Sequence, residues 1–200
     1  MKVTTLFAGV VLLAPTAGAQ RKVDAHHVFS DSLPQATITL DAALTNLGTQ
    51  RFVLYNVASA EQHFFAELDG TRIKRFVWIQ FEGYLTGANG RYDYHADSLM
   101  QLWGRQVYMS AGLLATPTVE RRPDSDGAKM RQFVREHGLT FDSTMLYHRL
   151  VTLVDDGSRN ELMIIYMEAP SAYGRPGVPI KSLLDESLER AKRSITLERR

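Results

Sequence analysis

The chain has 200 residues, of which 44% are hydrophobic and 22% charged, and it contains no cysteine. These values are ordinary for one globular domain, and without disulfides the fold must be held by packing alone. With 23 basic and 22 acidic residues the formal net charge is +1. Such a balanced surface offers no electrostatic basis for binding nucleic acid or an anionic membrane face.

The first 19 residues have the three parts of a cleavable secretory signal in the correct order. Lys2 supplies a positive charge, residues 6–14 (LFAGVVLLA) form an apolar stretch, and residues 17–19 (AGA) supply the small side chains expected before the cleavage site. The apolar stretch is too short for the ~20 residues of a membrane-spanning helix. We therefore expect an exported protein, periplasmic or secreted, with no transmembrane anchor after cleavage.

A flexible leader and then strands are predicted after the signal. Residues 20–34 show no sustained hydrophobic period and end in turn formers, which is typical of a mobile segment. Residues 35–40 (QATITL) alternate as a strand does, and residues 51–57 (RFVLYNV) have the aromatic and β-branched composition of a pleated surface. Between them, Asp41 is placed to cap a short helix that ends at Gly48.

A long β-hairpin is predicted around Asp69-Gly70. Residues 60–68 and 71–82 are strand-like, and they flank a dipeptide that favours a two-residue type I′ turn. Such a turn places Leu68 opposite Thr71, and this register then fixes every pair along the hairpin.

Two further strands and a helix follow in the middle of the chain. Strands are predicted over residues 91–95 and 101–109, the second with a bulge at Gly104. A helix is predicted from Ser125 to His137, because Met130, Phe133 and Val134 form an apolar stripe and a glycine follows at the position of a helix stop.

The last part of the chain predicts a second hairpin and a terminal helix. Residues 145–154 and 161–168 flank Asp156-Gly157, and the apolar run of the second segment is typical of a central strand covered on both faces. Residues 180–195 carry apolar side chains at helical spacing, which indicates an amphipathic helix lying across the sheet.

This order of elements predicts a single α+β domain over residues 35–200. The expected architecture is a mainly antiparallel sheet of about six to eight strands, with the mid-chain helix and the C-terminal amphipathic helix packed on it. Alternating strands and helices, which would indicate a doubly wound parallel sheet, do not occur.

The first hairpin carries the best candidate for acid–base chemistry. Its predicted register and the two-residue period of a strand put Glu61, His63 and Glu82 on one face beside the Trp78 ring. Two carboxylates near an imidazole can transfer protons without a metal, as a hydrolase or lyase requires. The alternative is an ordinary solvent-facing surface, because antiparallel sheets commonly leave one face in water.

Aromatic residues in the middle of the chain form the second candidate site. If their strands curve with the first hairpin, these side chains can line a pocket and offer hydroxyl groups to a ligand. The alternative is plain aromatic packing in a β-rich core. The residues are Trp78, Tyr84, Tyr92, Tyr94, Trp103 and Tyr108.

Motifs for other chemistry are missing from the sequence. It has no Gly-x-Ser-x-Gly elbow, no His-Glu-x-x-His helix, no glycine-rich phosphate loop and no cysteine-based metal site. We therefore expect neither a metal nor a cofactor.

Three functional hypotheses follow. The leading one is a non-catalytic exported module that binds an unknown small molecule through an aromatic-lined surface or pocket. The second is a metal-independent hydrolase or lyase that uses Glu61, His63 and Glu82. The third is an envelope-associated domain that docks another envelope protein on the solvent-facing side of the first hairpin.

Overall fold

The computed structural model describes residues 21–116, 122–170 and 177–199, which form two antiparallel sheets and two helices. The predicted signal over residues 1–19 lies outside the described residues. Sheet A has the strand order β1-β2-β3-β11, with bounds β1 (Lys22–Val23), β2 (His27–Ser30), β3 (Ala36–Leu40) and β11 (Ile195–Arg199). Sheet B has the order β4-β5-β6-β10-β9-β8-β7, with bounds β4 (Thr45–Leu54), β5 (Ala58–Asp69), β6 (Arg72–Tyr84), β7 (Ser98–Leu102), β8 (Arg105–Ala115), β9 (Thr144–Leu153) and β10 (Asn160–Glu168).

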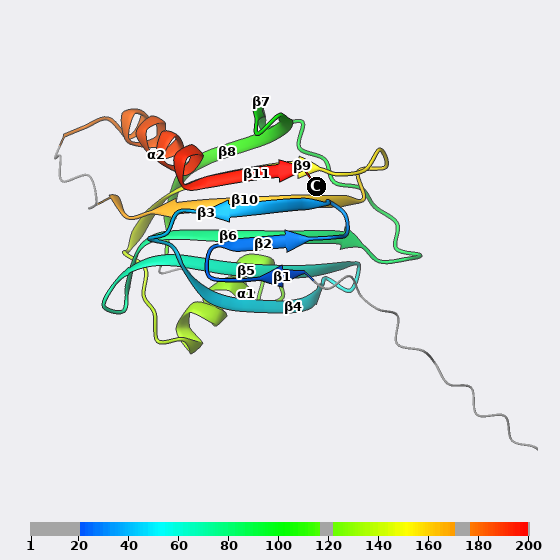
Figure 1. Cartoon of the computed structure of the whole chain (residues 1–200), viewed down its shortest axis with the longest axis horizontal. Coiled ribbons are helices and arrows are strands. Elements are labelled where there is room, and N and C mark those ends of the chain that lie inside the picture. Colours follow the sequence, from blue (N-terminus) through cyan, green and yellow to red (C-terminus); the bar gives the residue numbers. More distant parts are fainter. Residues whose placement is uncertain (1–20, 117–121, 171–176, 200) are drawn as a thin grey trace, which may run out of the picture.

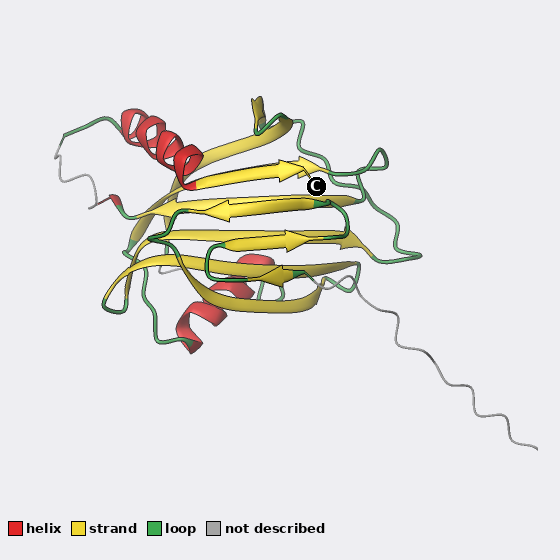
Figure 2. Cartoon of the chain, viewed as in Figure 1, coloured by secondary structure: helices red, strands yellow, loops and turns green. Residues whose placement is uncertain are grey.

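The two helices lie on opposite sides of sheet B (Figure 1). Helix α1 (Asp126–Glu136) packs against the face of sheet B that is turned away from sheet A. Helix α2 (Ile180–Ser194) lies beside sheet A and contacts β9. Colouring by secondary structure shows that strands dominate and that the helices cover only parts of the sheet (Figure 2). The predicted α+β class, with a mid-chain and a C-terminal helix on a mainly antiparallel sheet, is confirmed.

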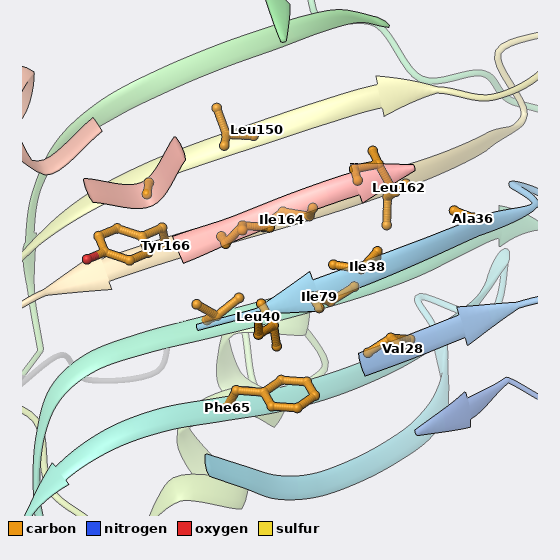
Figure 3. Packing of buried hydrophobic residues seen from close by; sticks show 14 of the residues in the cluster. Val28, Ala36, Ile38, Leu40, Phe65, Ile79, Leu150, Leu162, Ile164 and Tyr166 are labelled. Carbon is orange, nitrogen blue, oxygen red and sulfur yellow. The ribbon is translucent and has the colours of Figure 1, made fainter. Parts of the chain in front are cut away.

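The main core lies between the two sheets. Side chains of β2 and β3 face those of β5, β6, β9 and β10 across this layer, including Val28, Ile38, Phe65, Ile79 and Ile164 (Figure 3). The other face of β10 packs toward α1, so this strand is buried on both sides. Its nearly continuous apolar run therefore predicts its central position correctly.

Helix α1 begins and ends where the sequence predicts. The Ser125 hydroxyl accepts a hydrogen bond from the Ala128 amide, which satisfies a free donor in the first turn. Gly138 follows the helix with φ +66°, a backbone conformation that a glycine adopts without strain. Met130, Phe133 and Val134 are buried against sheet B, as their spacing indicates.

The N-terminal segment differs from the prediction in two places. Part of the predicted flexible leader forms strands β1 and β2, because pairing of β1 with β2 and of β2 with β3 compensates for their weak local pattern. The predicted helix after Asp41 is a single turn: the Asp41 carboxylate accepts a hydrogen bond from the Ala43 amide at 2.8 Å, and β4 begins at Thr45. The aspartate caps a turn, as aspartates commonly do outside helices.

The first hairpin forms as predicted, but its register is different. The two-residue loop is Gly70-Thr71, with φ +60° at Gly70, and Asp69 pairs with Arg72. A β-bulge then inserts Lys74, so that Glu67 pairs with Arg75. One extra residue reverses which side chains of β6 share a face with β5.

Smaller differences concern the middle and the end of the chain. Residues 91–95 form no strand, and Gly104 lies in a tight turn between β7 and β8 instead of in a bulge. Trp103 and Gly104 have φ +54° and +69°, the two positive values that a type I′ turn requires. After α2 the chain continues as β11, which the sequence analysis did not predict.

Truncating a core isoleucine should destabilise the protein, whereas the same change at the surface should not. Ile79 is fully buried between the sheets, and Ile180 at the start of α2 is 51% exposed. We expect Ile79→Ala to lower the free energy of unfolding by about 2–5 kcal/mol and Ile180→Ala by less than about 0.5 kcal/mol. Urea unfolding followed by circular dichroism measures both; equal midpoints for the two variants would contradict the assigned core.

Candidate functional site: a buried acid cluster beside a Trp78 hollow

The predicted catalytic group is divided between the two faces of sheet B. Glu61 and His63 face the layer between the sheets, opposite Phe81 and Ile79. Glu82 lies on the other face, where it pairs with Ala60. The prediction that these three residues form one acid–base set beside Trp78 is therefore wrong, and its physical cause is the bulge at Lys74.

Neither face of this hairpin is the solvent-facing surface that the interaction-domain hypothesis required. Residues 60–66 of β5 and 76–82 of β6 are all buried, because sheet A covers one face and α1 with its neighbouring loops covers the other. Residues 60–66 and 76–82 therefore do not provide the solvent-facing side on which this hypothesis was based.

Glu61 and His63 nevertheless remain neighbours. The Glu61 carboxylate lies 3.1 Å from His63 Nε2, 2.9 Å from a guanidinium nitrogen of Arg21 and 3.1 Å from one of Arg51. Burial alone would raise the pKa of Glu61, but the contacts from His63 and Arg51 and the charge of Arg21 lower it to about 2. Glu61 is therefore held as a carboxylate.

Most of the predicted aromatic residues gather on the α1 side of sheet B. The Tyr84 and Tyr92 rings lie 4.9 Å apart, and those of Tyr94 and Tyr108 lie 5.8 Å apart. Trp78 is buried on the same face, in the cluster that contains Tyr94 and Tyr108.

Trp103 is the exception among the predicted aromatic residues. Its indole nitrogen donates to the Ile195 carbonyl at 3.0 Å, and its ring packs on the core between the sheets. Trp103 therefore holds β11 in place and does not belong to the aromatic cluster around Trp78.

Two buried glutamates and a half-buried aspartate lie together on this face. Glu82 and Glu161 are directly opposite each other on the paired strands β6 and β10, and Asp126 in the first turn of α1 interacts electrostatically with both. The Tyr92 hydroxyl donates to Glu82 at 2.8 Å, and the Tyr94 hydroxyl donates to Glu161 at 2.6 Å. The segment between β6 and β7 thus covers the two glutamates with hydrogen-bond donors.

Burial shifts the protonation of all three acids in the same direction. It raises the pKa of Glu161 to about 8, and the charges of Glu82 and Asp126 add to this effect, although the bond from Tyr94 opposes it. Burial likewise raises the pKa of Glu82 and of Asp126. Perturbed carboxyl groups of this kind are concentrated at functional sites.

A row of glutamines connects the acid cluster to the edge of the sheet. The Gln50 amide donates to Gln62 at 2.6 Å, the Gln62 amide donates to Gln80 at 2.6 Å, and the Gln80 amide donates to Glu82. The Trp78 indole nitrogen also donates to Gln80, at 3.1 Å. The row holds Glu82 and the Trp78 ring in fixed orientations, because the Gln62 and Gln80 amides are each bonded on both sides.

A hollow of about 220 Å³ lies beside this cluster, between the sheet and the start of α1. Its lining is mostly apolar and includes three methionines and two aromatic rings, with one acid and two arginines. The lining residues are Trp78, Leu114, Asp126, Gly127, Met130, Arg131, Tyr147, Arg149, Met163, Ile165 and Met167.

Arg149 lines this hollow, and only part of its guanidinium is hydrogen-bonded. A terminal nitrogen of its guanidinium binds Asp97 at 2.7 Å, and the guanidinium lies 5.3 Å from the centre of the Tyr94 ring. Its Nε is buried and has no hydrogen-bond partner in the part of the chain that the structure describes. An unsatisfied buried donor on a side chain that lines a hollow is unusual, and it marks the hollow as a candidate ligand site.

Sequence reasoning identified part of this site and missed the rest. Trp78, Glu82, Tyr92 and Tyr94 were singled out, whereas Asp126, Glu161 and Arg149 were not. The missed signal is a charged residue inside or beside an apolar strand, as in residues 161–168 (ELMIIYME). That signal marks a buried charge, but only the pairing of β6 with β10 shows where it goes.

Comparisons with known proteins add no assignment to this geometry. No family model, no curated protein and no solved structure matches the chain. Among the described residues, no group of three or more His, Cys, Asp or Glu side chains is arranged to hold a metal ion. Neither helix in these residues is long and apolar enough to cross a membrane.

Replacing Glu161 should change how stability depends on pH. In the unfolded chain a glutamate releases its proton near pH 4.5, whereas folded Glu161 holds it to about pH 8. Between these values the folded state binds more protons, so rising pH destabilises it by up to about 1.4 kcal/mol per pH unit. We expect Glu161→Gln to be stabilised relative to the unmodified protein by an amount that grows over this window, as measured by urea unfolding at a series of pH values.

Glu61→Gln provides the matched control for this experiment. Because the pKa of Glu61 is lowered from 4.5 to about 2, its contribution is constant above pH 4.5 and is lost only as pH falls toward 2. Its stability difference from the unmodified protein should therefore stay flat between pH 4.5 and 8. A flat curve for Glu161→Gln as well would show that Glu161 is not held protonated by the fold.

Proposed function

We propose that this protein binds a small amphiphilic molecule, an apolar chain or ring with one carboxylate-like group, in the Trp78 hollow. The observation that carries the proposal is Arg149, which lines a mostly apolar hollow and whose buried Nε has no hydrogen-bond partner among the described residues. A ligand oxygen would satisfy that donor, while the remaining wall would cover the apolar part.

The apolar part of the hollow is formed by side chains that adapt to different shapes. Met130 approaches from α1, and Met163 and Met167 approach from β10, opposite the Trp78 ring. Methionine side chains are flexible and polarizable, so they suit a surface that closes around a variable apolar group.

Charges at the polar end favour an anionic group. Arg131 and Arg149 both line the hollow, and the positive end of the α1 dipole points to it from Asp126 and Gly127. Asp126 itself opposes an anion less than an ordinary aspartate does, because burial raises its pKa and favours the neutral form.

The size of the hollow limits the ligand. Its volume of about 220 Å³ is below the ~300 Å³ at which pockets for drug-sized molecules begin, so we propose a ligand smaller than these. A second hollow of about 450 Å³ lies on the other flank of α1 and shares Arg131 with the first. It offers room for a polar group that extends past the helix.

Export before binding is the other part of the proposal, and the sequence of residues 1–19 supports it. Cleavage after Ala19 would leave Arg21 in the mature chain. Arg21 is bonded to Glu61 and its guanidinium lies 3.8 Å from the centre of the Phe81 ring, so the proposed cut spares a residue that the fold uses.

Octanoate is a suitable first probe for the Trp78 hollow. With methionine methyl groups labelled with ¹³C, we expect saturable shifts of the Met130, Met163 and Met167 resonances and none for Met100. Octylammonium, which has the same chain and the opposite charge, should produce no saturable shift. Arg149→Lys should weaken octanoate binding by about 1.5–3 kcal/mol, because it removes Nε and keeps the charge.

Two neighbouring leucines of β8 provide the matched pair of variants. Leu114 lines the hollow, whereas Leu113 points to the opposite face and is 44% exposed. Leu114→Phe should fill the hollow and abolish binding, and Leu113→Phe should leave it intact. Binding that responds equally to both changes, or no binding of octanoate, would reject the proposed site.

The export proposal predicts the mature N-terminus. Expression of the full chain in a secreting bacterium should give a protein that begins at Gln20 in the periplasm or medium, as read by intact mass. Ala19→Arg should block cleavage, because signal peptidase requires a small residue there. A soluble cytoplasmic product that retains residues 1–19 would contradict the proposal.

A further inference from the structure

A second arrangement of reactive side chains lies at the edge of sheet B, on the face opposite the Trp78 hollow. Thr49 of β4 pairs directly with His63 of β5, and the next pair on the same face of the sheet is Arg51 with Glu61. The Thr49 hydroxyl is 2.8 Å from His63 Nδ1, and His63 Nε2 is 3.1 Å from a Glu61 oxygen. A hydroxyl, an imidazole and a carboxylate thus follow one another in close contact, and the buried His63 Nε2 approaches Glu61 without the alignment of a hydrogen bond.

We propose that Thr49, His63 and Glu61 form a catalytic site for hydrolysis of small carboxylic esters that carry an anionic group. The order of the three groups matches that of hydrolases in which a histidine activates a hydroxyl and a carboxylate orients the histidine. Thr49 and His63 are the catalytic residues, and Glu61 is a positioning residue.

The residue that carries the hydroxyl is exposed and the other two are buried, as this chemistry requires. Thr49 is exposed on β4, whereas His63 is fully buried and the Glu61 side chain is 8% exposed. A substrate can therefore reach the hydroxyl, while the imidazole behind it is shielded from water. A hollow of about 510 Å³ is lined by all three residues together with Arg21 and Arg51.

The proposed reaction requires one tautomer of His63. In this tautomer the Thr49 hydroxyl donates to Nδ1 across the 2.8 Å contact, and the ring proton lies on Nε2, 3.1 Å from the Glu61 oxygen. The carboxylate is itself held by Arg21 and Arg51. Because Glu61 stays ionised, it can stabilise the positive charge that His63 acquires during the reaction.

Arg51 indicates which esters fit the site. Its side chain is 57% exposed and lines the hollow beside Thr49, so its guanidinium can meet an anionic group of the substrate. Arg21 lines the same hollow and adds a second positive charge, and its buried Nε has no hydrogen-bond partner among the described residues. A dicarboxylic acid monoester satisfies both features.

The reaction proceeds in two balanced steps. Thr49 Oγ1 bonds to the ester carbonyl carbon, its proton passes to His63 Nδ1, and the carbon–oxygen bond to the alcohol breaks as His63 returns that proton to the leaving oxygen. Water then attacks the acylated Thr49, His63 accepts its proton and passes it to Thr49 Oγ1, and the carboxylic acid leaves.

The test uses the folded full-length domain with two probes, diisopropyl fluorophosphate and mono-4-nitrophenyl succinate. We expect the fluorophosphate to attach to Thr49, as located by peptide mass mapping, and the succinate ester to be hydrolysed faster than 4-nitrophenyl acetate. Thr49→Val should abolish the adduct, Thr49→Ser should retain it, and His63→Gln should slow hydrolysis by about 10²-fold or more.

Thr45→Val is the matched control, because Thr45 is an exposed threonine of the same strand that pairs with Ala66 instead of a histidine. It should leave both reactions unchanged. Glu61→Gln should lower kcat and leave KM unchanged. The proposal is overturned if no adduct forms on Thr49, or if Thr49→Val is labelled and hydrolyses the ester as well as the unmodified protein does. Because Thr49 is exposed, Thr49→Val should keep the unfolding midpoint of the unmodified protein.

Discussion

The bulge at Lys74 determines which side chains of sheet B face sheet A and which face α1. A single inserted residue lets Lys74 and Arg75 both bind the Glu67 carboxylate, and it changes the side of β6 that faces sheet A. With this pairing Val77, Ile79 and Phe81 enter the core between the sheets, while Trp78, Gln80 and Glu82 face α1. The two proposed sites follow from the same displacement, because it separates the Glu61–His63 pair from the acid cluster.

The face toward α1 combines tight packing with an unusual number of polar groups. Each buried polar group without a partner costs about 1–3 kcal/mol, so a polar layer persists only where its members bond to one another. The glutamine row and the two tyrosine hydroxyls provide these bonds for Glu82 and Glu161. Burying an ionised acid still costs free energy, and the fold reduces this cost by keeping Glu161 protonated to about pH 8. Proteins retain arrangements of this cost chiefly where function requires them.

Local signals in the sequence predicted the elements better than their pairing. The cap at Ser125, the stop at Gly138 and the apolar run of β10 each act within one element, and all three were predicted correctly. The bulge at Lys74 depends on contacts across two strands. The leader forms β1 and β2 because β2 pairs with β3 and β1 pairs with β2. The site shows the same division: Trp78 and Tyr94 were found by residue type, but their relation to Glu161 and Asp126 requires the sheet order.

Sheet A joins distant parts of the chain, and this has a consequence for biosynthesis. Strand β3 lies between β2 and β11, so residues 36–40 pair with residues 195–199 on one side. A growing polypeptide can form the β5–β6 hairpin early, but it cannot complete sheet A until β11 has been synthesised. Until then, apolar side chains of β6 and β10 remain open to water. A chain of this topology therefore stays incompletely folded until its last strand has been synthesised.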